Sequence, residues 1–282
     1  MSTMKLSISS KRQTFQKLHE SGCFVLPNPW DTGSARYLQS LGFKALATTS
    51  SGLAWSHGRP DNGLDCEAIL AHLADMVDAT DVPINADFEN GYADDAIHVE
   101  ENVRRAIQTG VAGISIEDST GLAGQPLYSI DEACSRLRAA RRAIDKEGGD
   151  VLLIGRAECF FVGRPDLAET IARLKAYSQV GADCLYAPGI RTREEIEAVV
   201  AAVHPKPVNL LVGSNSDMTV ADIAKLGVRR VSVGGALARV AWGGLMQAAR
   251  LLADEGRFDG FANAASGAEM NALFERQVNK RD

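Results

Sequence analysis

Short runs of β-forming residues alternate with longer segments of helical periodicity along almost the whole chain. Eight such runs are expected to be strands, and they are Cys23–Leu26, Ala45–Thr49, Val82–Asp87, Gly113–Glu117, Val151–Arg156, Cys184–Ala187, Val208–Val212 and Arg230–Val233. Strands that alternate with helices are typical of parallel sheets. Eight strands, each followed by a helix, predict an α/β fold in the form of a single closed (β/α)8 barrel, the TIM barrel. A doubly wound open sheet shares this alternation and stays the alternative.

Apolar residues recur at helical spacing between these runs. The expected helices are Cys66–Ala79, Ala96–Gln108, Asp131–Lys146, Pro165–Val180, Glu194–Val203, Val220–Leu226 and an alanine-rich helix from about Leu237 to Ala253. In the first of them, one apolar stripe is formed by Ile69, Leu70, Leu73, Met76 and Val77. Several helices are followed by a glycine that suits the left-handed residue after a helix end, namely Gly110, Gly148, Gly181 and Gly227.

The length of 282 residues fits one barrel, because α/β barrels reach roughly 250 residues as a single unit. No low-complexity linker divides the chain. We therefore expect a barrel domain that covers residues 1–255. Residues 256–282 fall outside the repeat and are expected to form a short helical appendage, which packs on its own barrel or on a neighbouring subunit.

Charge and hydropathy exclude several classes of partner. The 30 basic and 36 acidic residues give a formal net charge of −6 without a basic block, so no nucleic-acid partner is expected. No apolar run approaches the ~20 residues that span a bilayer, and residues 1–16 lack the apolar core of a signal peptide. Five scattered cysteines without a C-x-x-C pair argue against a disulfide framework or a zinc site. These features predict a soluble cytoplasmic protein with no membrane partner.

Acidic residues gather where the third and fourth expected strands end. Asp87 and Glu89 share one face of the third strand, because side chains alternate along a strand. Glu117 ends the fourth strand, Asp61 follows the second, and Asp118, of opposite parity, is expected to be structural. Adjacent carboxylates repel unless a cation or proton lies between them, so the first four could converge on one Mg²⁺ or Mn²⁺. Each acid alone could equally be a helix cap or a solvated loop charge.

The fifth expected strand ends with Arg156 and Glu158 on one face. Arginine binds carboxylates and phosphonates through paired hydrogen bonds, so Arg156 could clamp an anionic substrate. A structural ion pair with Glu158 or Glu117 is the alternative, and it does not exclude the first role. Gly234 and Gly235 open the last helix and could cradle a phosphate or simply pack the turn closely.

Five short motifs occur in order at these strand ends. They are S-G-L at 51–53, Asp61, D-F-E-N-G-Y at 87–92, I-E-D at 116–118 and G-R-A-E-C-F at 155–160. Together they resemble the isocitrate lyase / phosphoenolpyruvate (PEP) mutase superfamily, on the side of PEP mutase-like enzymes with 2-methylisocitrate lyase and oxaloacetate decarboxylase relatives. The resemblance implies a (β/α)8 barrel that binds Mg²⁺ and a small 2-oxo acid and makes or breaks C–C or P–C bonds. It also implies a homo-oligomer, a dimer or tetramer, in which the last barrel helix crosses to a neighbour.

The resemblance implies roles for individual residues. The direct metal ligand would be Asp87, with a water-mediated shell of Asp61, Glu89 and Glu117. Substrate oxygens would be held by Ser51, Gly52 and Leu53. Arg156 would bind the anionic end of the substrate, and Asn209 on the seventh strand would also contact the substrate. The catalytic set would be Arg156, Glu117, Tyr92 and Glu158. The family usually has an aspartate at the position of Glu89, whose longer side chain is expected to reach through a water.

The segment after Glu117 departs from the family pattern. Lyases of the superfamily carry a Lys-Lys/Arg-Cys-Gly-His loop there, and mutases carry a Lys and an Asn, whereas residues 119–128 read STGLAGQPLY. This difference argues against the usual isocitrate lyase, 2-methylisocitrate lyase and mutase activities. Glycines in the loop still suit a mobile lid. The proton donor stays open between Tyr92, Glu158 and Gln125.

The retained parts suffice to hold a 2-oxo acid on Mg²⁺ and to stabilise an enolate as a bond at C3 breaks. The sequence therefore predicts a Mg²⁺-dependent carbon–carbon lyase that acts on a small 2-oxo or 2-hydroxy di- or tricarboxylate. A phosphonopyruvate-type P–C hydrolase or mutase is the second candidate. A catalytically silent barrel that binds an oxo acid is the third.

Overall fold

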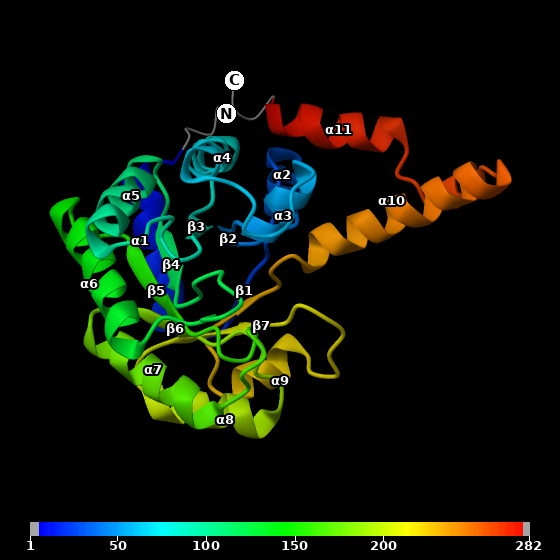
Figure 1. The fold of residues 1–282 in the computed structure, drawn as a ribbon. Helices are drawn as coiled ribbons and strands as arrows, with labels where there is room; N and C mark the ends of the chain where they lie inside the picture. The colour runs from blue at the N-terminus through cyan, green and yellow to red at the C-terminus, as the bar shows by residue number, and fades with distance from the viewer. Residues whose placement is uncertain (1–5, 279–282) are drawn as a thin grey trace.

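Eight parallel strands form the centre of the molecule, and helices surround them (Figure 1). The computed structural model describes residues 6–278. The strands are β1 (Phe24–Leu26), β2 (Leu46–Ala47), β3 (Ile84–Asp87), β4 (Gly113–Glu117), β5 (Leu152–Arg156), β6 (Cys184–Tyr186), β7 (Val208–Leu211) and β8 (Arg230–Ser232). They pair in the order β1-β8-β7-β6-β5-β4-β3-β2. Ala47 of β2 donates its N–H to the Pro27 carbonyl, directly after β1, at 3.1 Å, so the barrel is nearly closed. The predicted barrel is confirmed, and the open sheet is wrong.

Helices connect the strands in the predicted positions. They are α1 (Ile8–Glu20), α2 (Thr32–Ser40), α3 (Ser50–Ser56), α4 (Cys66–Ala79), α5 (Ala96–Gln108), α6 (Ile130–Lys146), α7 (Leu167–Gln179), α8 (Arg193–Val203), α9 (Val220–Lys225), α10 (Ala236–Glu255), the 3-10 turn η1 (Asp259–Phe261) and α11 (Gly267–Val278). The predicted helices from α4 to α10 are confirmed, with small changes at their ends. For example, α7 begins after Asp166, which caps it by accepting the Glu169 N–H at 2.9 Å. The four predicted helix-ending glycines all have positive φ.

The helices α1, α2 and α3 are absent from the predicted elements. α1 lies across the base of the barrel, where Phe15 is fully buried. A Cβ atom on Gly113 would lie 2.6 Å from Phe15 Cε1, so only glycine fits there. The second predicted strand ends early because α3 starts there: Thr49 caps this helix by accepting the Gly52 N–H at 3.3 Å. β2 is therefore shorter than the predicted 45–49.

The inside of the barrel is polar. Branched aliphatic side chains usually fill the interior of a TIM barrel in layers. Here β3, β4, β7 and β8 direct buried polar side chains toward the interior cavity. These side chains include Asn85, Ser115, Asn209, Arg230 and Ser232. The main apolar core lies instead between the strands and the outer helices, where apolar side chains from both pack against one another. The barrel therefore surrounds a polar space rather than a packed apolar centre.

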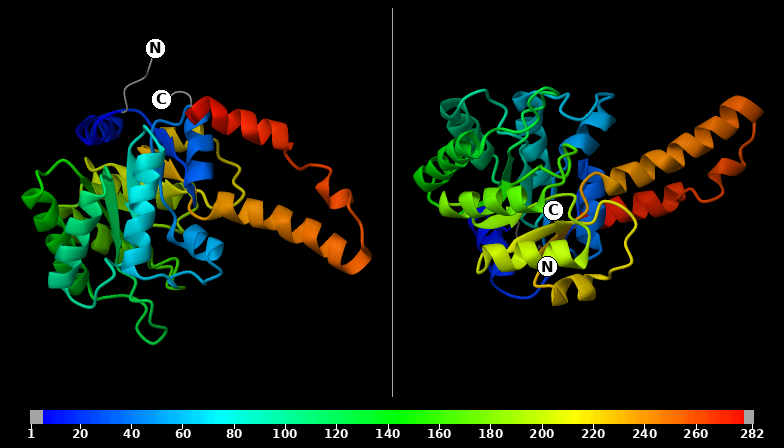
Figure 2. Two further views of the ribbon diagram at one scale, coloured as in Figure 1. Left: turned by 90° about the horizontal axis from the view of Figure 1, so that it is seen from above. Right: turned by 60° about the horizontal axis from the view of Figure 1, so that its bottom comes forward.

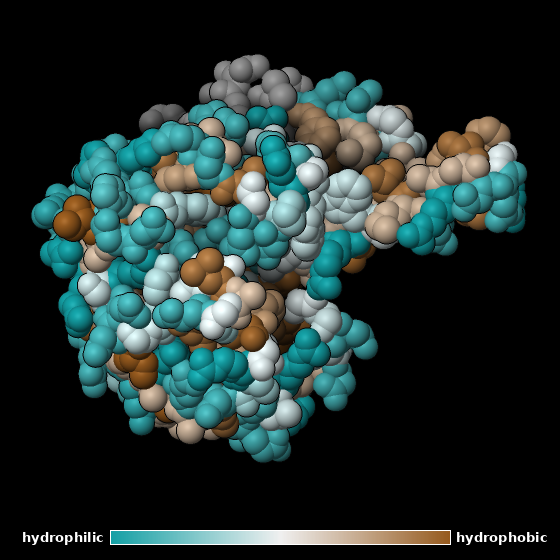
Figure 3. All heavy atoms as spheres, in the orientation of Figure 1, coloured by the Kyte–Doolittle hydropathy of each residue, from teal (hydrophilic) through white to brown (hydrophobic). Residues whose placement is uncertain are grey.

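The C-terminal helices leave the barrel. α10 projects away from the strands, and α11 runs back toward α2 (Figures 1 and 2). Within α10 only Ala238 is buried, and apolar side chains such as Val240 and Leu245 are exposed. Figure 3 shows hydrophobic side chains along this projecting arm. Gly256 follows α10 in the left-handed conformation, with φ of 66°. Among residues 6–278, no helix is long and apolar enough to cross a membrane.

Candidate active site

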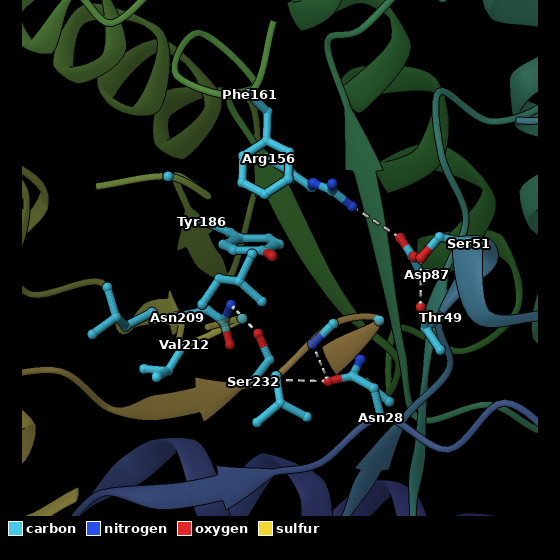
Figure 4. Close-up of a pocket in the computed structure, with 18 of the residues that line it drawn as sticks. Asn28, Thr49, Ser51, Asp87, Arg156, Phe161, Tyr186, Asn209, Val212 and Ser232 are labelled. Atoms are coloured by element: carbon cyan, nitrogen blue, oxygen red, sulfur yellow. Dashed lines mark hydrogen bonds and ion pairs between the residues drawn. The ribbon is translucent and has the colours of Figure 1, made fainter. Parts of the chain in front are cut away.

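A cavity of about 910 Å³ opens at the carboxyl ends of the strands and reaches down into the barrel. Figure 4 shows part of its wall. The predicted site residues that border it are Ser51, Asp61, Asp87, Glu89, Glu117, Arg156, Glu158 and Asn209. The predicted site residues that do not border it are Gly52, Leu53 and Tyr92. The barrel thus brings most of the predicted residues to one space.

Asp87, the last residue of β3, is held from two sides. Its N–H donates to Thr48 Oγ1 at 2.9 Å. Its Oδ2 accepts hydrogen bonds from the N–H and the hydroxyl of Ser50, at 3.0 and 2.9 Å. Its Oδ1 lies 3.0 Å from Arg156 Nη1 (Figure 4). The carboxylate is therefore fixed before any ligand arrives.

Arg156, at the end of β5, lies among three carboxylates. Its Nη1 is 3.0 Å from Asp87 and 3.1 Å from Glu117, and its Nε pairs with Glu158. The guanidinium carbon lies 5.1 Å from the centre of the Tyr186 ring, within the range of a cation–π contact. Both ion pairs considered as the alternative role of Arg156 are thus present. They fix the guanidinium at the cavity wall, and its role as a clamp for a substrate anion stays a prediction.

The upper part of the cavity holds more carboxylates than cations. Burial raises the pKa of Glu89 to about 7, and the nearby Asp87 adds to that shift. Burial, followed by the charge of Asp87, also raises the pKa of Asp61. The pKa of Glu117 is raised well above its usual value by burial, although Arg156 acts in the opposite direction. Arg156, the guanidinium that pairs with these acids, does not offset all of them, so the site favours an added proton or cation.

The oxygen ligands in this space fit a hydrated divalent cation. Within residues 6–278, no three acidic, histidine or cysteine side chains lie close enough to form a ready-made metal cluster. One reason is that Arg156 Nη1 bridges Asp87 and Glu117. Mg²⁺ usually keeps several waters and binds only one or two protein carboxylates directly. A donor set with one fixed aspartate and further acids around the same cavity agrees with that preference.

A comparison with protein families decides the assignment. Residues 15–253 match the family model described as phosphoenolpyruvate phosphomutase. The chain belongs to this family. A solved 2,3-dimethylmalate lyase, described as a member of the PEP mutase/isocitrate lyase superfamily, is 25% identical, with a TM-score of 0.82 over 95% of this chain and 91% of that one. The resemblance drawn from the strand-end motifs is therefore confirmed.

This member of the PEP mutase family is similar to curated proteins and to solved structures. An oxaloacetate decarboxylase of Paraburkholderia xenovorans is 31% identical over 79% of this chain and 74% of its own length. A Burkholderia cenocepacia protein named as a lyase/mutase is 44% identical, with a TM-score of 0.92 over 95% of this chain and 98% of that one. Oxaloacetate acetylhydrolase, solved with its product oxalate, is 28% identical, with a TM-score of 0.83 over 96% of each chain. The prediction of a carbon–carbon lyase is confirmed at this level, with the subclass open.

The S-G-L motif of this family member forms the first turn of α3. Ser51 borders the cavity, and its hydroxyl lies 3.1 Å from that of Thr49. The N–H groups of Gly52 and Leu53 donate to Thr49, at 3.3 and 3.1 Å. A Cβ atom on Gly52 would lie 2.7 Å from Thr49 Cγ2 and 3.0 Å from Trp30 Cβ. In this structure Gly52 and Leu53 therefore pack the start of the helix, and only Ser51 faces the cavity.

The chain turns sharply after β3. Glu89 and Tyr92 both have positive φ, 42° and 53°, which is uncommon for residues other than glycine. Glu89 still borders the cavity, although it lies beyond the strand whose alternation predicted its direction. Tyr92 packs edge-on against Phe88, with ring centres 5.1 Å apart, and its buried hydroxyl lies beside the Glu89 carboxylate. Tyr92 thus lies behind the cavity wall rather than on it.

Asp118 has the structural role that its parity predicts. It is buried, and its carboxylate accepts hydrogen bonds from Arg173 at 2.9 Å and from the Tyr177 hydroxyl at 2.5 Å. It also accepts the Glu158 N–H at 2.8 Å. This network fixes the backbone that carries Glu158 to the cavity.

Residues 119–128 form a short antiparallel loop beside the cavity. Ser119 and Leu127 pair through an isolated β-bridge. Ser119 borders the cavity, whereas Gln125 is exposed and does not. Of the three candidate proton donors, Glu158 is therefore the one that borders the cavity. The role of this loop as a lid stays a prediction.

Several cavity residues are missing from the predicted site. They are polar side chains below or beside the acids, and they include Asn28, Thr48, Ser50, Asn85, Ser115, Arg230 and Ser232. Asn85 could have been predicted from the sequence, because residues two apart on a strand share a face and Asn85 lies two residues before Asp87 on β3. β8 has only three residues, which is too short to show a two-residue period.

Proposed function

We propose that the chain is a Mg²⁺-dependent carbon–carbon lyase that acts on a small 2-oxo or 2-hydroxy di- or tricarboxylate. The observation that carries the proposal is the excess of carboxylates at the cavity mouth, where Arg156 is shared by Asp87, Glu117 and Glu158. Burial, followed by the charge of Asp87, raises the pKa of Glu89 to about 7, so this acid adds to the tendency of the site to take up a proton or a cation. A bound divalent cation would relieve the excess of negative charge.

The acids around the cavity would divide the work of holding the ion. Asp87 would bind it directly, and Asp61, Glu89 and Glu117 would bind it through water. Mn²⁺ could take the same place, since it accepts the same oxygen ligands. When bound, the ion would supply a Lewis acid for the charge that develops on the substrate's 2-oxo oxygen.

The substrate would be oriented by groups that the fold already holds in place. Arg156 would meet a substrate carboxylate, while its pairs with Glu117 and Glu158 keep the guanidinium in one orientation. The Ser51 hydroxyl and the Asn209 amide also border the cavity and would contact substrate oxygens. Because the fold supplies this orientation in advance, less entropy is lost when the substrate binds.

Glu158 is the residue proposed to handle the proton. Its side chain borders the cavity, and burial raises its pKa above the usual value for glutamate. A raised pKa favours the protonated form, so this carboxyl group can take up a proton and pass it to the carbon that loses its substituent. The Arg156 pair and the Asp118 contact to its N–H hold it there.

Relatives named for oxaloacetate favour a four-carbon 2-oxo dicarboxylate as substrate. Loss of the distal carboxylate of such a molecule as CO2 breaks the C3–C4 bond, and the electron pair of that bond forms an enolate whose negative charge lies on the 2-oxo oxygen. A P–C bond reaction is the second candidate, because the matching family model is described as a phosphomutase. The loop at 119–128 lacks the lysine and asparagine of mutases, so we rank it second.

The test is turnover by the purified chain with Mg²⁺ across a panel of 2-oxo and 2-hydroxy acids, with EDTA as the metal-free control. We expect cleavage of at least one C–C substrate, lost with EDTA and restored by Mg²⁺. Phosphate release from phosphonopyruvate would favour the second candidate. Tight calorimetric binding of oxo acids without any product would favour a silent barrel. A folded sample with neither turnover nor binding would contradict the proposal.

We also propose that the chain assembles as a homo-oligomer, a dimer or tetramer. The support is the projecting α10 helix, whose apolar side chains Val240, Leu245 and Met246 are 73%, 56% and 48% exposed. Exposed apolar surface of this kind is typical of protein interfaces. Light scattering on the purified chain should give a mass above that of one subunit, and a monomer at micromolar concentration would contradict this part of the proposal.

A further inference from the structure

In the part of the chain that the structure describes, Arg230 is a buried cation without a carboxylate partner. It begins β8 and is 2% exposed. Its Nε donates to Asn209 Oδ1 at 2.8 Å, and its Nη1 donates to Asn85 Oδ1 at 3.2 Å. Both acceptors are neutral amides. Within residues 6–278 no carboxylate forms a salt bridge with this guanidinium, in contrast to Arg156 one layer above.

The third neighbour of Arg230 is also neutral. His19 on α1 places Nε2 at 3.4 Å from Arg230 Nη1. The other ring nitrogen, Nδ1, lies 2.8 Å from the Phe15 carbonyl, so Nδ1 carries the hydrogen and Nε2 is the acceptor. Burial, together with Arg230, lowers the pKa of His19 to about 3. The imidazole is therefore uncharged at neutral pH, and the charge of Arg230 stays unbalanced.

Arg230 faces the same cavity as the acids. Its side chain borders the cavity together with Asn85, Asn209 and Ser232. Its Nη2 donates to no protein acceptor among the described residues, which leaves hydrogen-bond donors available. A guanidinium removed from water needs an anion or a full set of acceptors, because the isolated charge is costly to bury. The planar group of arginine suits a carboxylate in particular.

We propose that Arg230, with Asn85 and Asn209, forms a lower subsite that binds the distal carboxylate of a dicarboxylate substrate. Asn85 lies two residues before Asp87 on β3, and two residues of a strand span ~6.6 Å. A chain of four or five carbons can bridge that distance with a carboxylate at each end, whereas a monocarboxylate such as pyruvate reaches only the upper part. The subsite therefore selects dicarboxylates, and this inference rests on the proposed function of the upper site.

The test compares 2-oxoglutarate with pyruvate by calorimetry on the full-length chain loaded with Mg²⁺. The wild type should bind 2-oxoglutarate at least about tenfold more tightly than pyruvate, as expected for one charge-assisted hydrogen-bonded contact. Arg230→Met removes the cation. Asn85→Asp instead supplies Arg230 with a carboxylate partner, so this variant should keep the fold and exclude the ligand's carboxylate. Thermal unfolding checks both variants.

In each folded variant we expect 2-oxoglutarate affinity to fall at least about tenfold and pyruvate affinity to change less than about twofold. Unchanged 2-oxoglutarate affinity in Asn85→Asp, or an equal loss for both ligands, would overturn the subsite while leaving the upper site intact. A wild type that binds pyruvate as tightly as 2-oxoglutarate would do the same. A wild type that binds neither acid would overturn the proposed function and the subsite together.

Discussion

The upper and lower parts of the barrel cavity carry opposite charge imbalances. At the strand ends, Arg156 is paired with three carboxylates, and further acids border the same space. In the layer below, the hydrogen-bond partners of Arg230 among residues 6–278 are Asn85, Asn209 and His19, all of them neutral. Arg230 is buried, Arg156 is half-buried, and both border the cavity. The upper part therefore attracts a cation, and the lower part attracts an anion.

This comparison shows that burial alone does not assign a role to a charged side chain. The carboxylates around Arg156 make that guanidinium part of a rigid acidic site. The amides around Arg230 leave its charge available to a ligand. A dicarboxylate with its oxo group on a metal ion would match both parts at once.

Asp87→Asn should abolish most of the activity, because it removes a ligand charge that the fold has fixed with Ser50. We expect kcat/KM with Mg²⁺ to fall by more than about 100-fold, the size expected when an aligned electrostatic group is lost. Asp131→Asn, on the exposed first turn of α6, is the matched control and should keep wild-type activity. Activity of Asp87→Asn within a few-fold of wild type would remove the metal site from the account.

Removal of the two arginines should affect stability unequally. Arg156→Gln leaves Asp87, Glu117 and Glu158 without their cation, so unfolding free energy should fall by about 3–5 kcal/mol. Arg230→Met leaves only neutral acceptors unpaired, so the loss should be about 1–3 kcal/mol. Urea unfolding of both variants without metal measures the difference. A larger loss for Arg230→Met would contradict the contrast between the two parts.

Glu89 should make the stability of the metal-free protein depend on pH. Its pKa of about 7 in the folded state lies above its usual value, so the folded protein binds this proton more tightly than the unfolded chain does. The resulting stabilisation is complete below the usual pKa and is lost as pH rises through about 7, a loss of about 3 kcal/mol. Urea unfolding from acidic to mildly alkaline pH measures it.

Two comparisons check that Glu89 is the source of this slope. Glu89→Gln should remove most of it, and Mg²⁺ should restore wild-type stability above about pH 7, because a bound ion favours the deprotonated carboxylates. If the unfolding free energy of Glu89→Gln depends on pH as that of the wild type does, Glu89 is not the group that causes this dependence.

Ser50→Ala should have the smallest effect. It removes the hydroxyl contact to Asp87 at 2.9 Å but keeps the backbone N–H contact at 3.0 Å. We expect kcat to fall by roughly fivefold, corresponding to about 1 kcal/mol for one hydrogen bond. Ser56→Ala, at the other end of α3, is the control. A loss as large as that of Asp87→Asn would show that Ser50 does more than orient the aspartate.

The fold could be predicted because strand and helix periods alternate so regularly. The predicted strands from Gly113–Glu117 onward start and end close to β4 to β8, since continuous apolar runs and turn glycines mark them. α1 could not be predicted in this way, because it packs under the barrel through Phe15 and buries charged residues such as Lys11. A helix that buries a lysine does not show a plain apolar stripe.

The upper site could be predicted in large part, and the lower one could not. Asp87, Glu117 and Arg156 lie at strand ends, where this architecture places its chemistry. Tyr92 does not border the cavity, because the turn of positive φ after β3 packs its ring against Phe88. Arg230 sits in a three-residue strand and resembles a surface residue in sequence. Its burial depends on amides from β3 and β7, which only the closed barrel brings together.

Calorimetric titration of Mg²⁺ into the metal-free chain tests the central claim most directly. One ion should bind per chain, and in Asp87→Asn the heat of binding should disappear or the affinity should fall at least about tenfold, as expected when a charged ligand is lost. The Asp131→Asn control should bind as the wild type does. A wild type that binds no ion, or an Asp87→Asn variant that binds it equally well, would contradict the account.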